Sequence, residues 1–492
     1  MDKDQQTVTA ELLSLLGKEQ VVTSKEALYR ASMDNLRYSR LPGAVIWPSD
    51  EEAVATVLGL ANRERIPVTV RGAGSATTGS ATPLSGGWVL DLSGWKNLHI
   101  DPVSRMAFVQ PGVTLAELDA AAALHGLMYP PDPGSMKHAT IGGSIATNSG
   151  GMRGAKYGVT RDYVLSLEGF LPTGEFVRWG GRVRKFSAGY NLRDLWIGSE
   201  GTLGIVTGAV MKLIPRPPVR ATCLAVFPAA RAALECVHAL LRNGLTPSAV
   251  EFLDAQTVDC TLAFWKRKSP HLLAELPDCL GCRIDTVERP SVLLIEVDGS
   301  REEADTQLQA VLEQVRARAE GFQAAMDPET VEVLWKVRRS CSQAMFELGP
   351  RKLNEDVAVP FDQQLNLMEF VERMHADTGL PTPTFGHAAD GNFHVHVMYD
   401  DTDPVSSEKA GKAIRALMEK VVQLEGVISG EHGIGLAKSS FIELQHSPAE
   451  IGAMRAIKHA LDPNDILNPD KLWIPMEPWQ FPRENVRMPW DH

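Results

Sequence analysis

The segment from Pro133 to Gly158 reads PGSMKHATIGGSIATNSGGMRGAKYG, with seven glycines from Gly134 onward. Serine, threonine and asparagine stand between these glycines, a composition that lets the backbone pass close to a ligand. Ile141 and Ile145 give the segment apolar anchors that a flexible linker would lack. The pattern therefore favours a backbone cradle for a cofactor over a mobile loop.

A second glycine-rich run, Arg71 to Gly79 (RGAGSATTG), follows an expected strand at residues 67–70. Its glycines lack the G-x-G-x-x-G spacing of a nicotinamide-binding Rossmann unit, and no helical pattern follows them. Successive backbone N–H groups in such a turn can still bind phosphate without a cationic side chain. Residues 194–215 then place three more glycines before an apolar, β-rich stretch. These features argue against a nicotinamide cofactor and for phosphate contact through the backbone.

Two histidines alternate with apolar residues in the segment 384–396, which reads TFGHAADGNFHVH. The pattern predicts two strands joined by a tight turn at Asp390-Gly391. Period two puts His394 and His396 on one face, while His387 lies on the other arm of the hairpin. Histidines in a strand also occur in ordinary packing or hydrogen bonding, and we interpret His396 as filling its face in this way.

A second short run, residues 426–435 (GVISGEHGIG), sets Glu431 beside His432 between glycines. Two histidines and one carboxylate form a common ligand set for a catalytic divalent metal, with other positions open to substrate. We therefore predict His387, His394 and Glu431 as metal ligands and His432 as a neighbouring base. Mixed nitrogen and oxygen ligands permit zinc, manganese or iron.

The composition places limits on the class of protein. A chain of 492 residues is too long for one core, so two or three domains are expected. A net charge of -12 argues against nucleic acid or an anionic membrane as the main partner. The sequence shows neither a signal-peptide pattern nor an apolar run long enough for a membrane span, so we expect a cytoplasmic protein.

The six cysteines are few for this length, which fits a reducing compartment. Cys279 and Cys282 form a C-x-x-C pair, either a chance pair in a loop or a zinc or redox site. No run of cysteines has the spacing that would hold an iron–sulfur cluster.

Taken together, RGAGSATTG, PGSMKHATIGGSIATNSGG, YGVTRD and GSEGTLGIVT resemble the FAD-binding domain of the vanillyl-alcohol oxidase type of flavoprotein. GHAADGNFH and SGEHGIG narrow the resemblance to the FAD-linked D-2-hydroxy-acid dehydrogenases. That group includes D-lactate dehydrogenase, D-2-hydroxyglutarate dehydrogenase and the flavin subunit of glycolate oxidase. The resemblance runs from about residue 40 to about residue 472.

The resemblance implies an α+β fold with a two-subdomain FAD-binding domain and a substrate or cap domain built on an antiparallel sheet. We expect a helical lead-in over residues 1–38 and the FAD-binding domain over 39–218. The substrate domain with the metal site follows over 219–438, and a helical segment returns to the FAD-binding domain over 439–492.

The resemblance also implies noncovalent FAD, because some relatives attach the flavin through a histidine in the first glycine loop, where this chain has Ser75. The positions expected to bind FAD are Arg71, Gly72, Ala73, Gly74, Ser75, Thr78, Gly79, Pro133, Gly134, Ser135, Thr140, Gly142, Gly143, Ala146, Thr147, Asn148, Gly150, Gly151, Tyr157, Glu200, Gly201, Gly204, Ile205, Val206 and Asn468.

The activity implied is oxidation of a small D-2-hydroxy acid, D-lactate or glycolate, to the 2-oxo acid. The metal would lower the pKa of the substrate hydroxyl, His432 would take its proton, and a hydride would pass to flavin N5. Arg338 matches the family's arginine for the substrate carboxylate, and Lys352 is a second candidate for that role. The electrons would pass to a non-nicotinamide acceptor such as an iron–sulfur or electron-transfer flavoprotein subunit.

Two alternatives remain at this point. An alkylglycerone-phosphate-synthase-like flavoprotein shares the flavin domain but does no net redox chemistry and needs a phosphate site. A flavin electron-carrier subunit would do no substrate chemistry, and it has no use for a metal with open positions.

Overall fold

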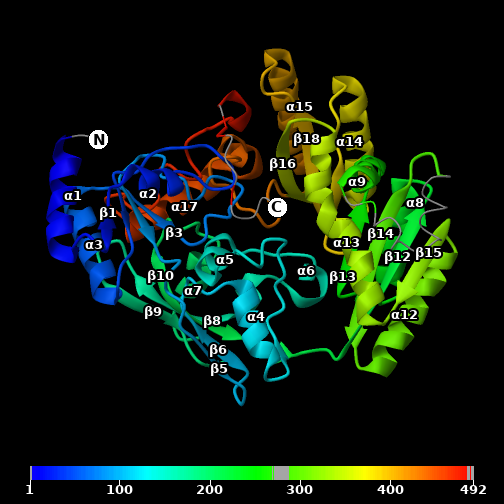
Figure 1. Ribbon diagram of the computed structural model, residues 1–492, viewed down its shortest axis with the longest axis horizontal. Coiled ribbons are helices and arrows are strands. Elements are labelled where there is room, and N and C mark those ends of the chain that lie inside the picture. Colours follow the sequence, from blue (N-terminus) through cyan, green and yellow to red (C-terminus); the bar gives the residue numbers. More distant parts are fainter. Residues whose placement is uncertain (1–2, 269, 271–286, 482, 485–487, 489–492) are drawn as a thin grey trace. The chain divides into compact units, whose positions relative to one another are not determined.

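The computed structural model describes residues 3–268, 270, 287–481, 483, 484 and 488, so the Cys279 and Cys282 pair lies outside the described residues. The chain forms two compact units (Figure 1). The first unit comprises Met1–Gly150, Val159–Arg216 and Glu431–His492, and the second comprises Gly151–Gly158 and Pro217–Gly430.

The first unit contains a four-stranded sheet in the order β1-β2-β4-β3, in which β4 runs parallel to β2 and β3. Asp50 caps the helix that follows β2 by accepting a hydrogen bond from the backbone N–H of Ala53. The elements are α1 (Lys3–Leu16), β1 (Val21–Val22), α2 (Lys25–Arg30), β2 (Ala44–Ile46), α3 (Glu51–Glu64), β3 (Val68–Arg71) and β4 (Trp88–Asp91).

An antiparallel five-stranded sheet in the order β5-β6-β10-β8-β9 forms the other half of this unit. Strands β8 and β9 are consecutive in the chain and pair as an antiparallel hairpin. The elements are β5 (Leu98–Asp101), β6 (Met106–Val109), α4 (Leu115–Ala123), β7 (Leu127–Met128), α5 (Ile141–Thr147), η1 (Thr160–Tyr163), β8 (Val164–Phe170), β9 (Phe176–Gly180), α7 (Leu192–Trp196), β10 (Ile205–Lys212) and β11 (Ile214–Pro215).

The C-terminal segment returns to the first unit. Leu467 forms a parallel bridge with Val68, so the segment extends the edge of β3. The remaining elements are η4 (Ser439–Phe441), α16 (Ile442–Gln445), α17 (Pro448–Leu461) and η5 (Pro478–Gln480). The helical pattern predicted for residues 439–461 is therefore present.

The second unit is built on an antiparallel seven-stranded sheet in the order β15-β12-β14-β13-β17-β18-β16. One face packs against α9 and α13 through a cluster that includes Leu224, Leu294 and Phe385, whereas α8 and α12 contact β12 and β14 outside that cluster. The elements are α6 (Gly154–Tyr157), β12 (Val219–Phe227), α8 (Ala230–Arg242), β13 (Ala249–Leu253), α9 (Ala255–Lys268), β14 (Ser291–Gly299), α12 (Arg301–Arg316), β15 (Gly321–Ala325), α13 (Pro328–Ala344), η2 (Met345–Glu347), β16 (Arg351–Ala358), η3 (Phe361–Gln363), α14 (Gln364–Thr378), β17 (Thr384–His387), β18 (Asn392–Tyr399) and α15 (Pro404–Gln423).

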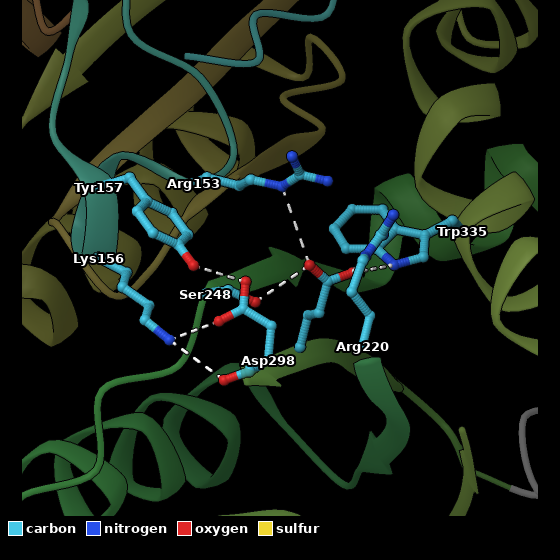
Figure 2. Close-up of polar contacts among 8 residues, drawn as sticks. Arg153, Lys156, Tyr157, Arg220, Ser248, Asp298 and Trp335 are labelled. Atoms are coloured by element: carbon cyan, nitrogen blue, oxygen red, sulfur yellow. Dashed lines mark hydrogen bonds and ion pairs between the residues drawn. The ribbon is translucent and has the colours of Figure 1, made fainter. Parts of the chain in front are cut away.

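Residues 151–158 form a short strap that belongs to the second unit, although the chain on both sides of it belongs to the first. The hydroxyl of Tyr157 donates to Asp298 at 2.8 Å, and the ammonium of Lys156 pairs with the same carboxylate (Figure 2). Arg153 lies 3.9 Å from Glu296, a second buried carboxylate of β14. The strap is therefore attached to the sheet by charged contacts.

Across the described part of the chain, every helix is too short or too polar to span a bilayer.

Candidate active site

The first unit contains a pocket between its two sheets, at the end of β3 and the start of α5. Predicted cofactor residues form much of its lining, which comprises Val70, Arg71, Gly72, Leu92, Pro111, Gly142, Gly143, Ala146, Trp196, Ser199, Gly201, Gly204 and Val206. The predicted residues Arg71, Gly72, Gly142, Gly143, Ala146, Gly201, Gly204 and Val206 are thus brought together around one cavity.

Several glycines of this lining are required by close packing behind the pocket. A Cβ at Gly72 would lie 2.3 Å from Thr140 Oγ1, and one at Gly142 would lie 2.6 Å from the ring of Pro111. At Gly204 the added atom would meet the Trp196 ring at 2.2 Å. Side chains at these positions would clash with these neighbours, so the packing around the pocket requires glycine there.

The first glycine run offers donors for a phosphate. Within the described part of the chain, the backbone N–H groups of residues 72–78 donate to no protein acceptor. A row of outward N–H groups in a turn suits an anion, as expected for the pyrophosphate of FAD. The first unit therefore has two features that fit a dinucleotide cofactor. One is an apolar pocket, and the other is an adjacent set of backbone N–H donors.

Glu200 and Asn468 hold the structure together near this pocket and do not line it. The Glu200 carboxylate accepts hydrogen bonds from the N–H groups of Ile434 and Gly435 at 2.8 and 2.9 Å. The Asn468 amide donates to the carbonyl oxygens of Ser80 and Glu200. Burial raises the pKa of Glu200 to about 7.

Buried charges accompany Arg71 behind the pocket. Arg71 donates to the carbonyl of Met33 at 2.8 Å, and Lys471 donates to that of Thr82 at 2.6 Å. Burial raises the pKa of the nearby Asp34 to about 6 and lowers that of Lys471 to about 8. This group joins the lead-in, the first glycine run and the C-terminal segment.

The other predicted cofactor positions are divided between the two units. Gly151 and Tyr157 lie on the strap of the second unit, where Tyr157 binds Asp298. The remaining positions lie in the first unit, outside the pocket lining: Ala73, Gly74, Ser75, Thr78, Gly79, Pro133, Gly134, Ser135, Thr140, Thr147, Asn148, Gly150 and Ile205.

The predicted histidine hairpin is confirmed in the second unit as β17–β18. Phe385 pairs with His394 and His387 pairs with Asn392, so His387 and His394 share one face as diagonal neighbours. Their rings are perpendicular with centroids 5.3 Å apart, and their ligand nitrogens lie within 4.8 Å of each other. Both side chains are buried, an arrangement in which two imidazoles can bind one ion.

A buried carboxylate that the sequence reasoning missed lies beside this pair. Glu251 is on β13, directly opposite His387, and its Oε1 is 2.5 Å from His387 Nδ1. Its other oxygen pairs with Nε of Arg338, and the guanidinium of Arg338 lies over the Phe385 ring at 4.1 Å. The available signal was a lone acid in the apolar strand AVEFL.

Asp356 is a second carboxylate that the sequence reasoning missed. It pairs with His394 across β16 and β18, and a carboxylate oxygen lies within 4.8 Å of a His394 ring nitrogen. Asp356 also accepts hydrogen bonds from the Asn392 amide at 2.6 Å and the Ser429 hydroxyl at 3.1 Å. Side chains alternate between the two faces of β16, so Asp356 lies on the same face as Lys352, a predicted site residue. This alternation could have indicated Asp356 from the sequence.

Lys352 and His396 make other contacts on this face. The Lys352 ammonium donates to the carbonyl and hydroxyl of Ser342 at 3.0 and 2.7 Å, at the end of α13. His396 is buried with its Nδ1 3.2 Å from the Pro383 carbonyl oxygen, and its ring centroid is 5.0 Å from that of Phe385.

Glu431 and His432 begin the last segment of the first unit. In that unit a Cβ on Gly150 would lie 3.0 Å from Glu431 Oε2, so this carboxylate reaches the glycine-rich segment. Gly430, the preceding residue, belongs to the second unit and packs on Asn392 and Asp356.

Two family models match the chain. The model described as FAD linked oxidases, C-terminal domain, matches residues 216–472, and the FAD binding domain matches residues 42–180.

Two curated relatives resemble the chain over most of their length. It is 36% identical to the glycolate oxidase subunit GlcD of Bacillus subtilis, covering 95% of this chain and 96% of that protein. It is 35% identical to a D-lactate dehydrogenase of Anaerostipes hadrus, covering 88% of this chain and 89% of that one.

Solved structures share the fold. p-Cresol methylhydroxylase aligns with a TM-score of 0.78 at 18% identity, covering 96% of this chain and 98% of the other. An alkyldihydroxyacetonephosphate synthase aligns with a TM-score of 0.74 at 20% identity, covering 94% and 84%. At these identities the likeness concerns the fold, which is of the vanillyl-alcohol oxidase type, as predicted.

The fold and the glycine-lined pocket together define an FAD-dependent oxidoreductase. The chain belongs to the family of FAD-linked oxidases.

Proposed function

We propose that the chain oxidises a small D-2-hydroxy acid, D-lactate or glycolate, to the 2-oxo acid with the help of a divalent metal. The observation that carries this proposal is the buried pair of His387 and His394, which lies on the sheet face that Arg338 of α13 covers. A 2-hydroxy acid presents a hydroxyl and a carboxylate on adjacent carbons, and these are the groups that a metal and a guanidinium recognise. The names of the relatives, glycolate oxidase subunit and D-lactate dehydrogenase, support the same substrate class.

The residues present fit a metal. Two neutral imidazoles and a carboxylate suit zinc, manganese or iron, and we propose His387, His394 and Glu431 as the ligands. Such an ion, when bound, supplies Lewis acidity that lowers the pKa of the substrate hydroxyl.

The other side chains have separate roles in the proposed reaction. Arg338 binds the substrate carboxylate and orients the molecule, while Lys352 adds positive charge on the same sheet face. His432 takes the hydroxyl proton. Residues of the first unit such as Arg71, Gly72 and Gly143 would hold FAD without a covalent link, and the cofactor would supply a hydride acceptor for C2 of the acid.

The electrons then leave to an acceptor other than a nicotinamide. An iron–sulfur or electron-transfer flavoprotein subunit is the proposed partner, in keeping with the word subunit in the name of one relative. The cytoplasmic location expected from the sequence stays a prediction.

The flavin absorbance of the anaerobic protein tests the proposal. Glycolate, D-lactate, L-lactate and D-2-hydroxyglutarate are added in turn, before and after treatment with a chelator. We expect D-lactate or glycolate to bleach the flavin, L-lactate to leave it oxidised, and chelation to abolish bleaching until metal is restored. If none of the acids reduces a flavin that dithionite reduces, the proposal is wrong and a carrier role or a non-redox role replaces it.

A further inference from the structure

Glu251 lies between the two parts of the proposed substrate site. It occupies the middle of β13, with Leu294 of β14 on one side and His387 of β17 on the other, and its side chain is fully buried. A buried carboxylate is costly unless its oxygens are paired, so this residue needs its partners. Each of its oxygens binds a different side chain of the site, His387 through Oε1 and Arg338 through Oε2.

The contact with His387 settles which nitrogen of the ring faces a metal. The carboxylate accepts a hydrogen bond from Nδ1–H, which leaves Nε2 as the ligand atom. A carboxylate behind a metal-binding histidine also fixes the orientation of the ring. Glu251 Oε1 lies 2.5 Å from Nδ1 of His387. Glu251 therefore leaves Nε2, on the opposite side of the ring, as the one defined atom through which His387 binds a metal.

The contact with Arg338 settles which edge of the guanidinium meets the substrate. Because Nε donates to Glu251, the edge offered to a carboxylate is the one formed by the two Nη groups. The Phe385 ring lies 4.1 Å from the guanidinium carbon and holds the plane of the group. Arg338 is anchored on α13, whereas His387 is on β17, and Glu251 is bound to both.

We infer that Glu251 is a positioning residue that fixes His387 and Arg338 relative to each other, so that hydroxyl and carboxylate of one 2-hydroxy acid are recognised together. This inference rests on the proposed function and deepens it. The site selects acids in which the two groups are on adjacent carbons and discriminates against simple alcohols and 3-hydroxy acids.

The test compares Glu251→Gln with Glu296→Gln in the full-length FAD-loaded protein. Glu296 is a matched control because it is also fully buried in the same sheet. It binds Arg220, and it holds α13 through the Trp335 N–H at 3.1 Å (Figure 2). If anchoring α13 were the whole role of Glu251, both variants would behave alike.

Three quantities are measured for each variant. The first is the affinity for Zn²⁺ or Mn²⁺ by competition with a chromophoric chelator, and the second is the steady-state kinetics (KM and kcat) with the better substrate of D-lactate and glycolate. The third is the melting temperature, and the flavin absorbance of each sample gives its FAD content. We expect Glu251→Gln to weaken metal affinity by about 10- to 100-fold and to raise KM by a similar factor, with FAD content unchanged. Glu296→Gln should leave metal affinity and KM within about twofold while lowering the melting temperature.

Glu251→Asp keeps the charge and serves if the Gln variant fails to fold. Its carboxylate is shorter by one methylene, so we expect it to retain one partner at most and to weaken metal affinity or raise KM. The inference is overturned if both Glu251 variants keep wild-type metal affinity and KM, or if Glu296→Gln causes the same losses. If the wild-type protein binds no metal and oxidises no hydroxy acid, the proposed function fails and the inference fails with it.

Discussion

At the scale of single residues, Arg338, which we propose to bind the substrate carboxylate, has surroundings that differ from those of its neighbour Arg339. Its side chain is 12% exposed and is held by Glu251 and Phe385, whereas the adjacent Arg339 is 47% exposed and pairs with Glu332. A planar guanidinium that stacks on a ring cannot be replaced by an ammonium without loss of geometry.

We expect Arg338→Lys to raise KM for the hydroxy acid by about 10- to 100-fold, in line with the roughly 1.5–3 kcal/mol of a charged hydrogen-bonded contact. Metal affinity should stay within a few-fold. Arg339→Lys is the control and should leave KM unchanged. Steady-state kinetics with flavin reduction as the readout checks this, and equal KM values for the two variants would remove Arg338 from the site.

Asp34 gives a pH dependence that concerns stability. Burial raises its pKa to about 6, while hydrogen bonds from the Leu36 and Ala81 N–H groups and the charges of Arg71 and Lys471 act in the opposite direction. Because the folded pKa is above the unfolded value of 3.8, the folded protein binds more protons between the two values. The contribution is fully present below pH 3.8 and is lost as the pH rises through 6, about 3 kcal/mol in all.

The Asp34→Asn variant lacks this titration. We therefore expect the melting temperature of the wild type to fall relative to that of Asp34→Asn as the pH rises from about 4 to about 6.5, by at least about 2 °C. Thermal unfolding followed by circular dichroism at a series of pH values checks this. A constant difference across the series would show that the carboxyl does not titrate in that window.

At the scale of secondary-structure elements, the α5 helix contains two pocket glycines with different surroundings. A Cβ at Gly143 would meet only Thr140 Oγ1 at 3.4 Å, an ordinary contact, whereas one at Gly142 would meet Pro111 at 2.6 Å. Alanine at position 143 therefore fits the protein without FAD, and it favours the helix by about 1 kcal/mol. The same methyl group would enter the space that FAD is expected to occupy.

We expect Gly143→Ala to raise the melting temperature of the FAD-free protein and to weaken FAD affinity by about 5- to 150-fold, since overpacking costs about 1–3 kcal/mol. Gly59→Ala is the control, because Gly59 lies inside α3 with no atom within 4 Å of its Cβ position. It should give the same stabilisation with unchanged FAD affinity, measured by quenching of FAD fluorescence. Unchanged affinity in Gly143→Ala would place the flavin elsewhere.

Elements that depend on local sequence were predictable. The β17–β18 hairpin followed from Asp390-Gly391 and from the alternation of apolar residues and histidines, because these signals lie within a few residues of the structure they determine. Glu251 was not predictable as a partner of His387, because 136 residues separate them and only the sheet order brings them together.

At the scale of the whole molecule, the division of the chain between the two units was the feature least predictable from the sequence. The FAD-binding domain expected from the sequence, residues 39–218, includes residues 151–158, yet these residues belong to the second unit. What places them there is the pairing of Lys156 and Tyr157 with Asp298, a contact across 141 or more residues. No local pattern in the strap reveals that partner.

The contact of the strap with Asp298 predicts that the strap becomes accessible to protease when this contact is removed. Lys156 is 23% exposed at its side chain and Asp298 is 4% exposed, so the ion pair is partly shielded from solvent, and an amide at position 298 would remove its negative charge. We expect Asp298→Asn to let trypsin cut after Arg153 or Lys156 at least tenfold faster than in the wild type, because the strap detaches before the units unfold.

Asp305→Asn, a change of an exposed acid on α12, is the control and should be cut at the wild-type rate. Mass spectrometry of the fragments identifies the cut. If Asp298→Asn is cut no faster at residues 153 and 156, the strap is held by contacts other than this carboxylate, and the Arg153–Glu296 pair becomes the next to substitute.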